Sequence, residues 1–311
     1  MKPIVIATRR SALARWQADH IADRIRTLTG REVELLLIVT KGDKILDVPL
    51  AQVGGKGLFV KEIEEALLDG RADLAVHSLK DVPTQFPPGL VLGAITERED
   101  PRDAICSPKY GNLAALPQGA RVGTSSLRRQ AQLKAIRPDI ELVNVRGNVQ
   151  TRLSKTESEC DAVVLAYAGL KRLGLGEQAT EILDVVRSIP AIGQGALAIE
   201  IRENDPEIGP IVARLEHAET RAAVTAERAL LARLEGGCQV PIAGHAVVRD
   251  GQVHLDGLVG SPDGKQILRV QRSGAVAEAE LIGTQAAESL LKQGAQAILD
   301  SLVGTKVGVP H

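Results

Sequence analysis

Aromatic side chains are scarce in this chain of 311 residues, which holds one Trp, two Tyr and two Phe. The bases of single-stranded nucleic acids stack on such rings, so their scarcity argues against a protein that binds single strands. The formal net charge of −1 provides no overall field that would attract polyanions. With few rings available, the hydrophobic cores must be built from Leu, Ile, Val and Ala.

Cysteine is also scarce, and Cys106, Cys160 and Cys238 lie far apart. An odd number at wide spacing disfavours a disulfide framework and favours a reducing cytoplasm. The six histidines are scattered, and none stands at metal-ligand spacing from a cysteine, so we predict no metal site. The N-terminal apolar run is too short for a signal peptide, and no stretch approaches a membrane span. We therefore expect a cytoplasmic protein without a nucleic-acid or membrane partner.

The length predicts two or three domains, and the first two thirds of the chain repeat one pattern. Apolar strand patterns alternate with helical ones, which predicts mostly parallel sheets with helices on both faces. In the first unit the strands are 3–7, 33–39, 72–79 and 90–96, and the helices are 11–29 and 57–69. The charged segment 97–105 is expected to cross into the second unit, which has helices 126–138 and 148–156 and strands 140–145 and 161–168.

The last third of the chain has a different pattern. Residues 189–205 are expected to cross back as a strand, and a long helical stretch follows at 207–235. Three strands are then expected within 241–274, joined by the turn sequences RDGQ and SPDGK, with a helix at 276–301. This pattern predicts a small α+β domain.

Two segments share an arrangement typical of anion binding. Thr8, Arg9, Arg10 and Ser11 open the first helix, and Thr124–Arg129 (TSSLRR) opens a helix of the second unit. Hydroxyl side chains cap helix N-termini, and the amides there attract anions. Arginines at such a position are unfavourable unless an anion lies between them and the amides. A plain helix cap with solvated arginines is the alternative, but two such segments favour a shared anion-binding cleft.

Other segments have a functional and an ordinary interpretation. Arg146 and Arg152 flank Gly147, which permits a tight turn, and Arg172 follows another element; each arginine alone is more often a surface charge. Lys80 and Asp81 end a strand in HSLKDVP, where Asp81 is either a turn residue or a proton donor and counter-charge. GGKGLF has the wrong spacing for a phosphate loop, so we interpret it as a lid.

The loop LEGGCQVPIAG sets Cys238 after two glycines and two residues before a proline. A free cysteine is usually a buried apolar filler, and composition alone favours that role. The motifs together change this expectation. TRRSALA, GGKGLF, HSLKDVP, GTSSLRR, NVRGNVQTRL, AIGQGALAIE and ERALLARLEGGCQVPIAG occur in this order, and over nearly its whole length the chain resembles the hydroxymethylbilane synthases, also called porphobilinogen deaminases.

This resemblance implies a fold of two α/β domains like those of periplasmic binding proteins and a third, α+β domain. The expected domains are 1–98 with the return segment 196–215, then 99–195, then 216–311. The expected reaction joins four porphobilinogen molecules head to tail, releases ammonia at each step, and frees hydroxymethylbilane by hydrolysis, as part of tetrapyrrole and heme biosynthesis.

The resemblance also implies residue roles. Cys238 would carry a dipyrromethane cofactor through a thioether, and Asp81 would be catalytic and contact the cofactor. The other expected cofactor-binding residues are Ser11, Lys80, Thr124, Ser125, Ser126, Arg128, Arg129, Arg146 and Gly147. The expected substrate-binding residues are Arg9, Arg146, Arg152, Arg172 and Gln194, and Lys56 and Phe59 belong to the expected lid. Arg10 stands where many relatives carry a neutral residue, so its role stays open, and Cys106 and Cys160 are expected to be structural.

Three other hypotheses stay open at this point. A two-lobed anion-binding protein would bind its ligand reversibly and carry no covalent adduct. A nucleic-acid-binding protein would show binding that depends steeply on salt. A thiol hydrolase would need a histidine such as His77 or His245 close to Cys238. We expect a monomer whose small-molecule substrate is porphobilinogen.

Overall fold

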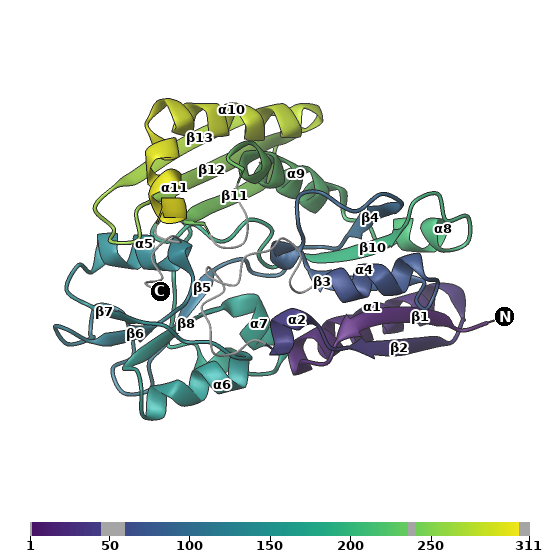
Figure 1. The fold of residues 1–311 in the computed structure, drawn as a ribbon, viewed down its shortest axis with the longest axis horizontal. Coiled ribbons are helices and arrows are strands. Elements are labelled where there is room, and N and C mark those ends of the chain that lie inside the picture. The colour runs from purple at the N-terminus through teal and green to yellow at the C-terminus, as the bar shows by residue number, and fades with distance from the viewer. Residues whose placement is uncertain (1, 45–59, 236–239, 305–311) are drawn as a thin grey trace, which may run out of the picture.

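The computed structural model describes residues 2–44, 60–235 and 240–304. These residues form three sheets, each with its own helices, and the three units meet around the middle of the molecule (Figure 1). The predicted lid residues Lys56 and Phe59 and the predicted cofactor residue Cys238 lie outside the described residues.

The first sheet has the strand order β2-β1-β3-β10-β4. Its strands are β1 (Ile4–Arg9), β2 (Val33–Ile38), β3 (Leu74–Ser78), β4 (Leu90–Ile95) and β10 (Leu197–Arg202). Strands β1, β2 and β3 are parallel, whereas β10 enters between β3 and β4 and is antiparallel to both. A strand from residue 197 onward therefore completes the sheet of the N-terminal segment.

Two helices cover opposite faces of this sheet. Helix α1 (Ala12–Thr29) packs in one core with Ile4 and Ile6 of β1. Helix α4 (Lys61–Leu68) packs on the other face, in a core with Ala7 of β1. The short helix α2 (Lys41–Lys44) follows β2.

The ends of α1 follow from its sequence. Ser11 is the N-cap, and its hydroxyl accepts a hydrogen bond from the Ala14 amide at 3.3 Å. Gly30 closes the helix with φ of 68°, a left-handed conformation that glycine adopts without steric cost. The predicted helix 11–29 is therefore confirmed to within one residue.

The second sheet has the order β7-β6-β8-β5-β9. Its strands are β5 (Asp103–Cys106), β6 (Arg121–Gly123), β7 (Glu141–Val143), β8 (Ala162–Ala166) and β9 (Glu181–Ile182), and its helices are α5 (Leu127–Ile136), α6 (Val149–Ser154) and α7 (Tyr167–Arg172). The expectation that 97–105 is only a crossing segment is wrong in its last part, because β5 begins at Asp103. All four residues of β5 are buried, but the charged residues before them mask so short a strand.

The third unit is the α+β domain that the sequence predicts. Strands β11 (Ile242–Arg249), β12 (Gln252–Gly260) and β13 (Ile267–Ala275) form an antiparallel sheet. Asp250 and Gly251 join the first two strands with φ of 51° and 72°, as a tight hairpin turn requires. Helices α9 (Ala218–Arg233) and α10 (Ala279–Lys292) share one core with the inner face of this sheet. The fold class of two α/β units and a small α+β unit is thus confirmed.

The two long helices predicted in the last third are each divided. Residues 207–235 form α8 (Ile208–Ala213) and α9, because His217 leaves the helix and its ring nitrogen caps the Thr220 amide at 3.2 Å. Residues 276–301 form α10 and α11 (Ala295–Gly304), because Gly294 has φ of 100° between them. Helical periodicity continues across both breaks, so the sequence pattern alone does not reveal them.

A single buried carboxylate joins the third unit to the segments that connect the two α/β sheets. Glu227 of α9 is fully buried and accepts four hydrogen bonds. Arg98 of the first crossing donates two, at 2.6 and 3.2 Å, and the Gly193 and Ala246 amides each donate one at 2.7 Å. We propose the domain boundaries predicted above, and the membership of each sheet supports them.

Replacing Glu227 by Gln is expected to lower the free energy of unfolding by about 3–5 kcal/mol, because it removes one partner of a buried ion pair and leaves Arg98 uncompensated. Urea denaturation of both proteins measures this difference. The matched control is Glu288→Gln, since Glu288 pairs with Arg233 on the surface, where each side chain is 44% exposed. Its expected cost is at most about 1 kcal/mol. Equal losses in the two variants would contradict the structural role of Glu227.

Candidate active site

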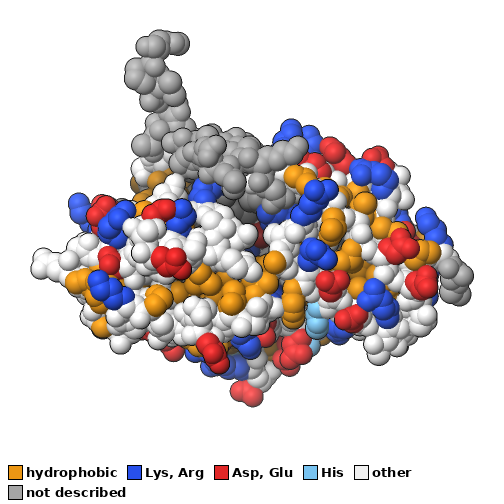
Figure 2. All heavy atoms as spheres, turned by 90° about the horizontal axis from the view of Figure 1, so that it is seen from below, with side chains coloured by type: hydrophobic (Ala, Val, Ile, Leu, Met, Phe, Trp, Pro, Cys, Tyr) orange, Lys and Arg blue, Asp and Glu red, His pale blue; other side chains and the backbone are white. Residues whose placement is uncertain are grey.

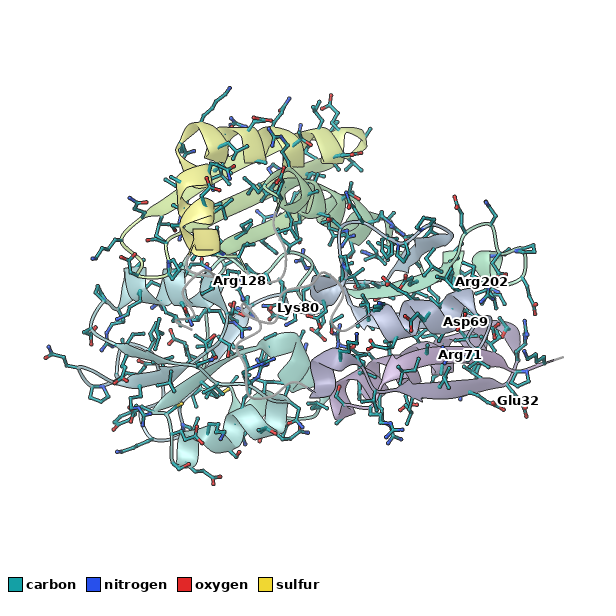
Figure 3. All side chains as sticks on the ribbon, viewed as in Figure 1. Glu32, Asp69, Arg71, Lys80, Arg128 and Arg202 are labelled. Carbon is teal, nitrogen blue, oxygen red and sulfur yellow. The ribbon has the colours of Figure 1, made fainter. Side chains whose placement is uncertain are left out.

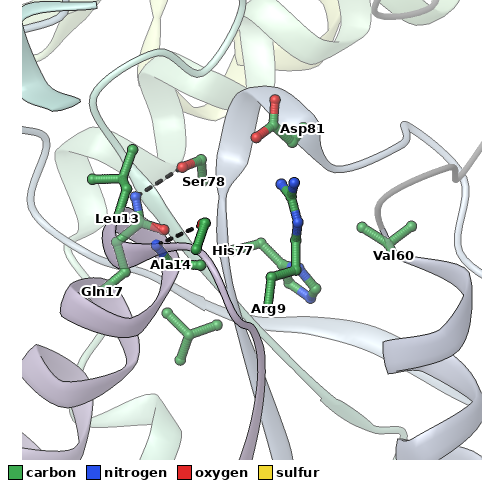
Figure 4. Close-up of a pocket in the computed structure, with 10 residues that line it drawn as sticks. Arg9, Leu13, Ala14, Gln17, Val60, His77, Ser78 and Asp81 are labelled. Atoms are coloured by element: carbon green, nitrogen blue, oxygen red, sulfur yellow. Dashed lines mark hydrogen bonds between the residues drawn. The ribbon is translucent and has the colours of Figure 1, made fainter. Parts of the chain in front are cut away.

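The predicted residues of the first unit gather at the carboxyl ends of its parallel strands. Arg9 ends β1, and a single 3-10 turn (Leu79–Asp81) after β3 carries Lys80 and Asp81. Figure 4 shows the Arg9 guanidinium pointing toward Asp81 across a pocket. The pocket is lined by Arg9, Ser11, Leu13, Ala14, Gln17, Val60, Val76, His77, Ser78 and Asp81. A cation and a carboxylate thus face one small space.

Lys80 points away from this pocket toward the crossing segment. Its ammonium donates to the side-chain oxygen of Gln194 at 3.4 Å. Burial lowers the pKa of Lys80 to about 8, partly opposed by Asp81, with Arg129 lowering it further. Figure 3 shows Lys80 and Arg128 in the middle of the molecule, between the two α/β sheets. Lys80 of the first unit is therefore close enough to the arginines of the second unit for their charges to act on it.

Arg128 and Arg129 of α5 are held by a residue that the sequence analysis missed. Asp103 is fully buried, and its carboxylate accepts from Arg128 at 2.7 Å and from Arg129 at 2.8 Å. Gln194 donates to the same carboxylate at 2.9 Å. The two arginines also donate to backbone carbonyls at 2.9 Å, Arg128 to Ile189 and Arg129 to Val164. Both guanidinium groups are thus buried and oriented by an internal anion.

Burial alone would raise the pKa of Asp103, but the charges and hydrogen bonds of Arg128 and Arg129 outweigh it and hold that pKa well below its usual range. A carboxylate whose pKa falls on folding stabilises the protein above its unfolded-state pKa of about 3.9, and this stability is lost as the pH falls further.

Replacing Asp103 by Asn is accordingly expected to cost about 3–5 kcal/mol at pH 7, because two buried cations lose their counter-ion. The difference in stability between the variant and the parent protein should shrink as the pH falls below about 4. Thermal unfolding midpoints of both proteins at pH 7, 5 and 3.5 follow this difference. Asp23→Asn is the control, since Asp23 is 76% exposed. A difference between parent and variant that stays constant with pH would contradict this account.

The hydroxyl residues before α5 act mainly as caps. Ser126 is the N-cap, and its hydroxyl accepts from the Arg129 amide at 3.5 Å. The Thr124 hydroxyl accepts from the Ser126 amide at 3.2 Å, and Ser125 donates to the Val145 carbonyl at 2.6 Å and to the Asn144 side chain. The hydroxyl residues thus cap the helix as the alternative interpretation expects, but that interpretation is wrong about the arginines, because Arg128 and Arg129 are buried rather than solvated. Any anion would join residues that already have partners.

The segment after β7 forms the tight turn expected from the sequence. Gly147 has φ of 110°, and a Cβ atom there would lie 2.7 Å from the Thr151 methyl carbon. Its carbonyl accepts from Arg152 Nε at 2.8 Å. Burial lowers the pKa of Arg152 to about 10; Arg129 and Arg146 lower it too, and Asp81 opposes them. Charges from both α/β units therefore act on Arg152.

Arg172 at the end of α7 reaches the second crossing segment. It donates to the Gly195 carbonyl at 2.6 Å, and its guanidinium carbon lies 5.9 Å from the centre of the Trp16 ring. Burial lowers the pKa of Arg172 to about 10, and Glu99 partly opposes this shift. Arg172, predicted from sequence, thus lies where α1 of the first unit and α7 of the second come together.

Cys106 and Cys160 are both buried in the core of the second unit. Burial raises the pKa of Cys106 to about 12 and also raises that of Cys160. Both residues therefore suit the structural role predicted for them. Within the described residues, no group of three or more His, Cys, Asp or Glu side chains could hold a metal ion. No helix there is long and apolar enough to cross a membrane.

The surface gives no sign of a nucleic-acid-binding face in the view of Figure 2, where acidic and basic side chains are interspersed. Among the predicted basic residues, Arg128 and Arg129 are buried and most of the others are partly buried, so they do not form an exposed stripe. This distribution fits a small anionic ligand better than a polyanion.

Comparison with known proteins identifies the relatives of this chain. A family model described as "Porphobilinogen deaminase, dipyromethane cofactor binding domain" matches residues 4–209, and one described as "Porphobilinogen deaminase, C-terminal domain" matches 221–292. Proteins named porphobilinogen deaminase from Pelobacter propionicus and Nitratidesulfovibrio vulgaris are each 56% identical to the chain, over 299 and 306 residues. The matches cover 96% of both chains for the first and 97% of both for the second. The solved structure of the methionine binding protein MetQ matches 68% of this chain and 89% of its own, at 14% identity and a TM-score of 0.45.

Proposed function

The chain belongs to the porphobilinogen deaminase family, and from that premise we infer that it joins four porphobilinogen molecules head to tail and releases hydroxymethylbilane. The reaction is a group transfer of tetrapyrrole biosynthesis with loss of one ammonia per addition. The observation that carries this function is the gathering of Arg9, Lys80 and Asp81 at the carboxyl ends of the first sheet, next to the basic residues of the second.

We propose that a dipyrromethane cofactor is attached to Cys238. The matched family model is that of a dipyrromethane cofactor-binding domain, which implies such a group. Cys106 and Cys160 are buried, and burial raises their thiol pKa values, so neither suits nucleophilic attachment. Cys238 lies in the sequence GGCQVP, where the two glycines leave room for a bulky adduct.

The basic residues of the site suit such a group. Each pyrrole carries an acetate and a propionate, so the cofactor and the growing chain bring many carboxylates into the molecule. We propose that Lys80, Arg146, Arg152 and Arg172 bind these carboxylates, with Arg9, Ser11 and Gln194 toward the incoming substrate. The lowered pKa values of Lys80, Arg152 and Arg172 support this, because buried cations gain most from an added anion. When bound, the cofactor would supply the carbon atom to which the first substrate is joined.

Arg128 and Arg129 would contribute in a different way from that expected. Asp103 already neutralises one of their two charges, so the three side chains together carry one net positive charge. The ion pairs with Asp103 also hold both guanidinium groups in place. We propose that this net charge attracts cofactor carboxylates to the N-terminus of α5. Thr124, Ser125 and Ser126 follow the end of β6 there, and Gly147 follows the neighbouring strand β7.

Asp81 is proposed as the catalytic residue. Loss of ammonia from the aminomethyl group of porphobilinogen leaves a cationic pyrrole, and a carboxylate beside the pyrrole nitrogen stabilises that cation. The carboxyl group can also take up and return the protons that the reaction moves. Arg9, on the other side of the pocket, would hold a substrate carboxylate and so orient the ring toward Asp81.

We further propose that the enzyme acts as a monomer in the cytoplasm and needs no metal ion. Lys56 and Phe59, which lie outside the described residues, are proposed to belong to a lid over the reacting groups. No histidine stands at metal-ligand spacing from a cysteine in the sequence, which supports the proposal that no metal ion is needed.

The experiment that tests the function measures the stoichiometry of turnover. Purified protein is incubated with porphobilinogen, and substrate loss, ammonia release and product are followed together. Four substrate molecules consumed and four ammonia molecules released per hydroxymethylbilane are expected from the reaction proposed. Reversible binding of porphobilinogen without ammonia release would instead indicate a two-lobed anion-binding protein.

A further inference from the structure

The turn that carries Lys80 and Asp81 is fixed on its N-terminal side by the first sheet. The Leu79 amide donates to the carbonyl of Ala196, the residue before β10, at 3.0 Å. The Leu79 side chain is buried in a core with residues of β4 and β10. A backbone hydrogen bond and a buried side chain thus set the position of the chain where it enters the turn.

The C-terminal side of the turn is held from another unit. Residues 82–89, all within the described part of the chain, belong to no helix or strand, so no ladder of strand hydrogen bonds holds the first carbonyls after Asp81. Arg228 of α9 donates to both: to the Val82 carbonyl at 3.1 Å and to the Pro83 carbonyl at 2.6 Å. This two-point contact, the Arg228 clamp, holds the chain directly after Asp81.

The helix that carries Arg228 is itself anchored at this level. Val224 lies one turn earlier on the same face of α9 and shares a buried core with Leu79 and Val82. Glu227, the residue before Arg228, accepts the four hydrogen bonds described above. In Figure 1, α9 lies on the side of the third unit that faces the first sheet. Arg228 therefore reaches the turn from a fixed point of the third unit.

The chemistry of the contact explains why an arginine stands here. A planar guanidinium presents several donors in a rigid fork, which matches two successive carbonyls, whereas an ammonium is a single centre. The guanidinium carbon also lies 5.9 Å from the centre of the Phe86 ring, at the distance of a cation–π contact. Arg228 is absent from the described residues that line the pocket of Arg9 and Asp81. Its contacts with the reacting groups therefore run through the turn.

We propose that Arg228 is a positioning residue that holds the Asp81 carboxylate in place beside the substrate. This inference rests on the proposed function, because it takes Asp81 as the catalytic group. Arg228 takes part in no covalent step and moves no proton. It fixes the two carbonyls that follow Asp81 and so restricts the movement of the turn. Because α9 precedes Cys238 in the sequence, the Arg228 clamp also ties the turn to the unit that contains the proposed attachment residue.

Loss of the Arg228 clamp is expected to lower kcat for porphobilinogen while KM stays close to the parent value. A misplacement of about 1 Å at a reacting centre can cost about 10²-fold in rate, so Arg228→Met should lower kcat by about 10- to 10²-fold. KM should change little, because every residue that lines the pocket is retained. Arg228→Lys keeps the charge and can donate to one carbonyl, so it should recover part of the loss. Intact mass should show the parental adduct in both variants.

The test combines Arg228→Met with Asp81→Asn in the holoenzyme. A residue that acts through the Asp81 carboxylate has little left to position once that carboxylate is gone, so Arg228→Met should lower the kcat of the Asp81→Asn protein by no more than about twofold. Arg233→Met is the matched control, since Arg233 lies on the same helix but pairs with Glu288 on the surface, and it should leave the kcat of each background unchanged. An equal loss from Arg228→Met with and without the Asp81 carboxylate would overturn the inference, because Arg228 would then have a general structural role.

Amide hydrogen exchange of the peptide spanning residues 79–86 separates this inference from the proposed function. Exchange there should be about tenfold faster in Arg228→Met than in the parent, because two hydrogen bonds that hold the segment are lost, and it should be unchanged in Arg233→Met. A parent protein without turnover, or an Asp81→Asn protein with the parental rate, contradicts the proposed function alone, and the exchange rates then decide whether the Arg228 clamp holds the turn. Parental exchange of this peptide in Arg228→Met would overturn the inference.

Discussion

Replacing Asp81 by Asn is expected to lower kcat by about 10²–10³-fold while the protein keeps its fold and its covalent adduct, because removal of one charge stabiliser at a reacting centre commonly costs this much. Asp81 is the acidic residue that lines the pocket with Arg9, and it comes directly after Lys80 in the turn following β3. The amide of Asn has nearly the same shape, but it carries no negative charge opposite the cationic pyrrole. Single-turnover and steady-state rates with porphobilinogen measure the loss.

Two controls make this prediction specific. Asp69→Asn removes an exposed carboxylate that makes only a 3.4 Å contact with Arg71, and its kcat should equal the parent value. Intact mass of Asp81→Asn should show the same adduct as the parent, which separates a loss of chemistry from a loss of cofactor. A near-parental rate in Asp81→Asn would exclude the catalytic role, and Lys80 would then be the first candidate to test in its place.

Much of the fold could be predicted because local signals mark its elements. Ser11 and Gly30 delimit α1, and the turn residues Asp250 and Gly251 mark the hairpin of the third unit. The strands of the first unit contain runs of apolar residues, as is typical of strands in a sheet that helices cover on both faces. Where these signals are short or interrupted, the prediction failed: β5 has four residues, and the break before α9 depends on the side chain of His217.

The residues of the candidate site that end strands could be predicted from the sequence, whereas those whose partners lie far away in the sequence could not. Arg9, Lys80 and Asp81 each end a strand of a parallel sheet, so the topology alone brings them to one edge. Asp103 lies 25 and 26 residues before the two arginines that it binds, and no spacing rule connects them. A buried pair of adjacent arginines does require a counter-ion, but the sequence does not show that they are buried.

The same limit applies to the residues that join the units. Glu227 looks like one charge among several on a long helical stretch, yet it is fully buried and binds Arg98, 129 residues earlier. Glu200 stands between Ile199 and Ile201 in the buried part of β10, and this position among apolar residues is a local sign that its carboxylate is buried. A charged residue inside a buried apolar run therefore indicates an oppositely charged or hydrogen-bonding partner elsewhere in the fold, because burying an ion without a partner is costly.

Replacing Cys238 by Ser is expected to abolish the covalent adduct completely, and with it turnover of porphobilinogen. The intact mass of the denatured parent protein should exceed the mass of its sequence by a two-pyrrole group, because a thioether survives denaturation whereas a bound anion is washed away. Peptide mapping should place the added mass in the peptide that contains LEGGCQVPIAG. The hydroxyl of Ser is a far weaker nucleophile at neutral pH than a thiol, so the variant should show the mass of its sequence alone.

The other two cysteines provide the matched controls for this last prediction. Cys106→Ser and Cys160→Ser change buried residues of the second unit's core, and both should keep the adduct even where they lower stability. If the parent protein itself carries no adduct, incubation with porphobilinogen decides between two causes, since only an apo-enzyme gains two pyrroles on Cys238. An adduct that persists in Cys238→Ser and disappears in Cys106→Ser or Cys160→Ser would refute the assignment, because attachment would then require a thiol that the fold buries.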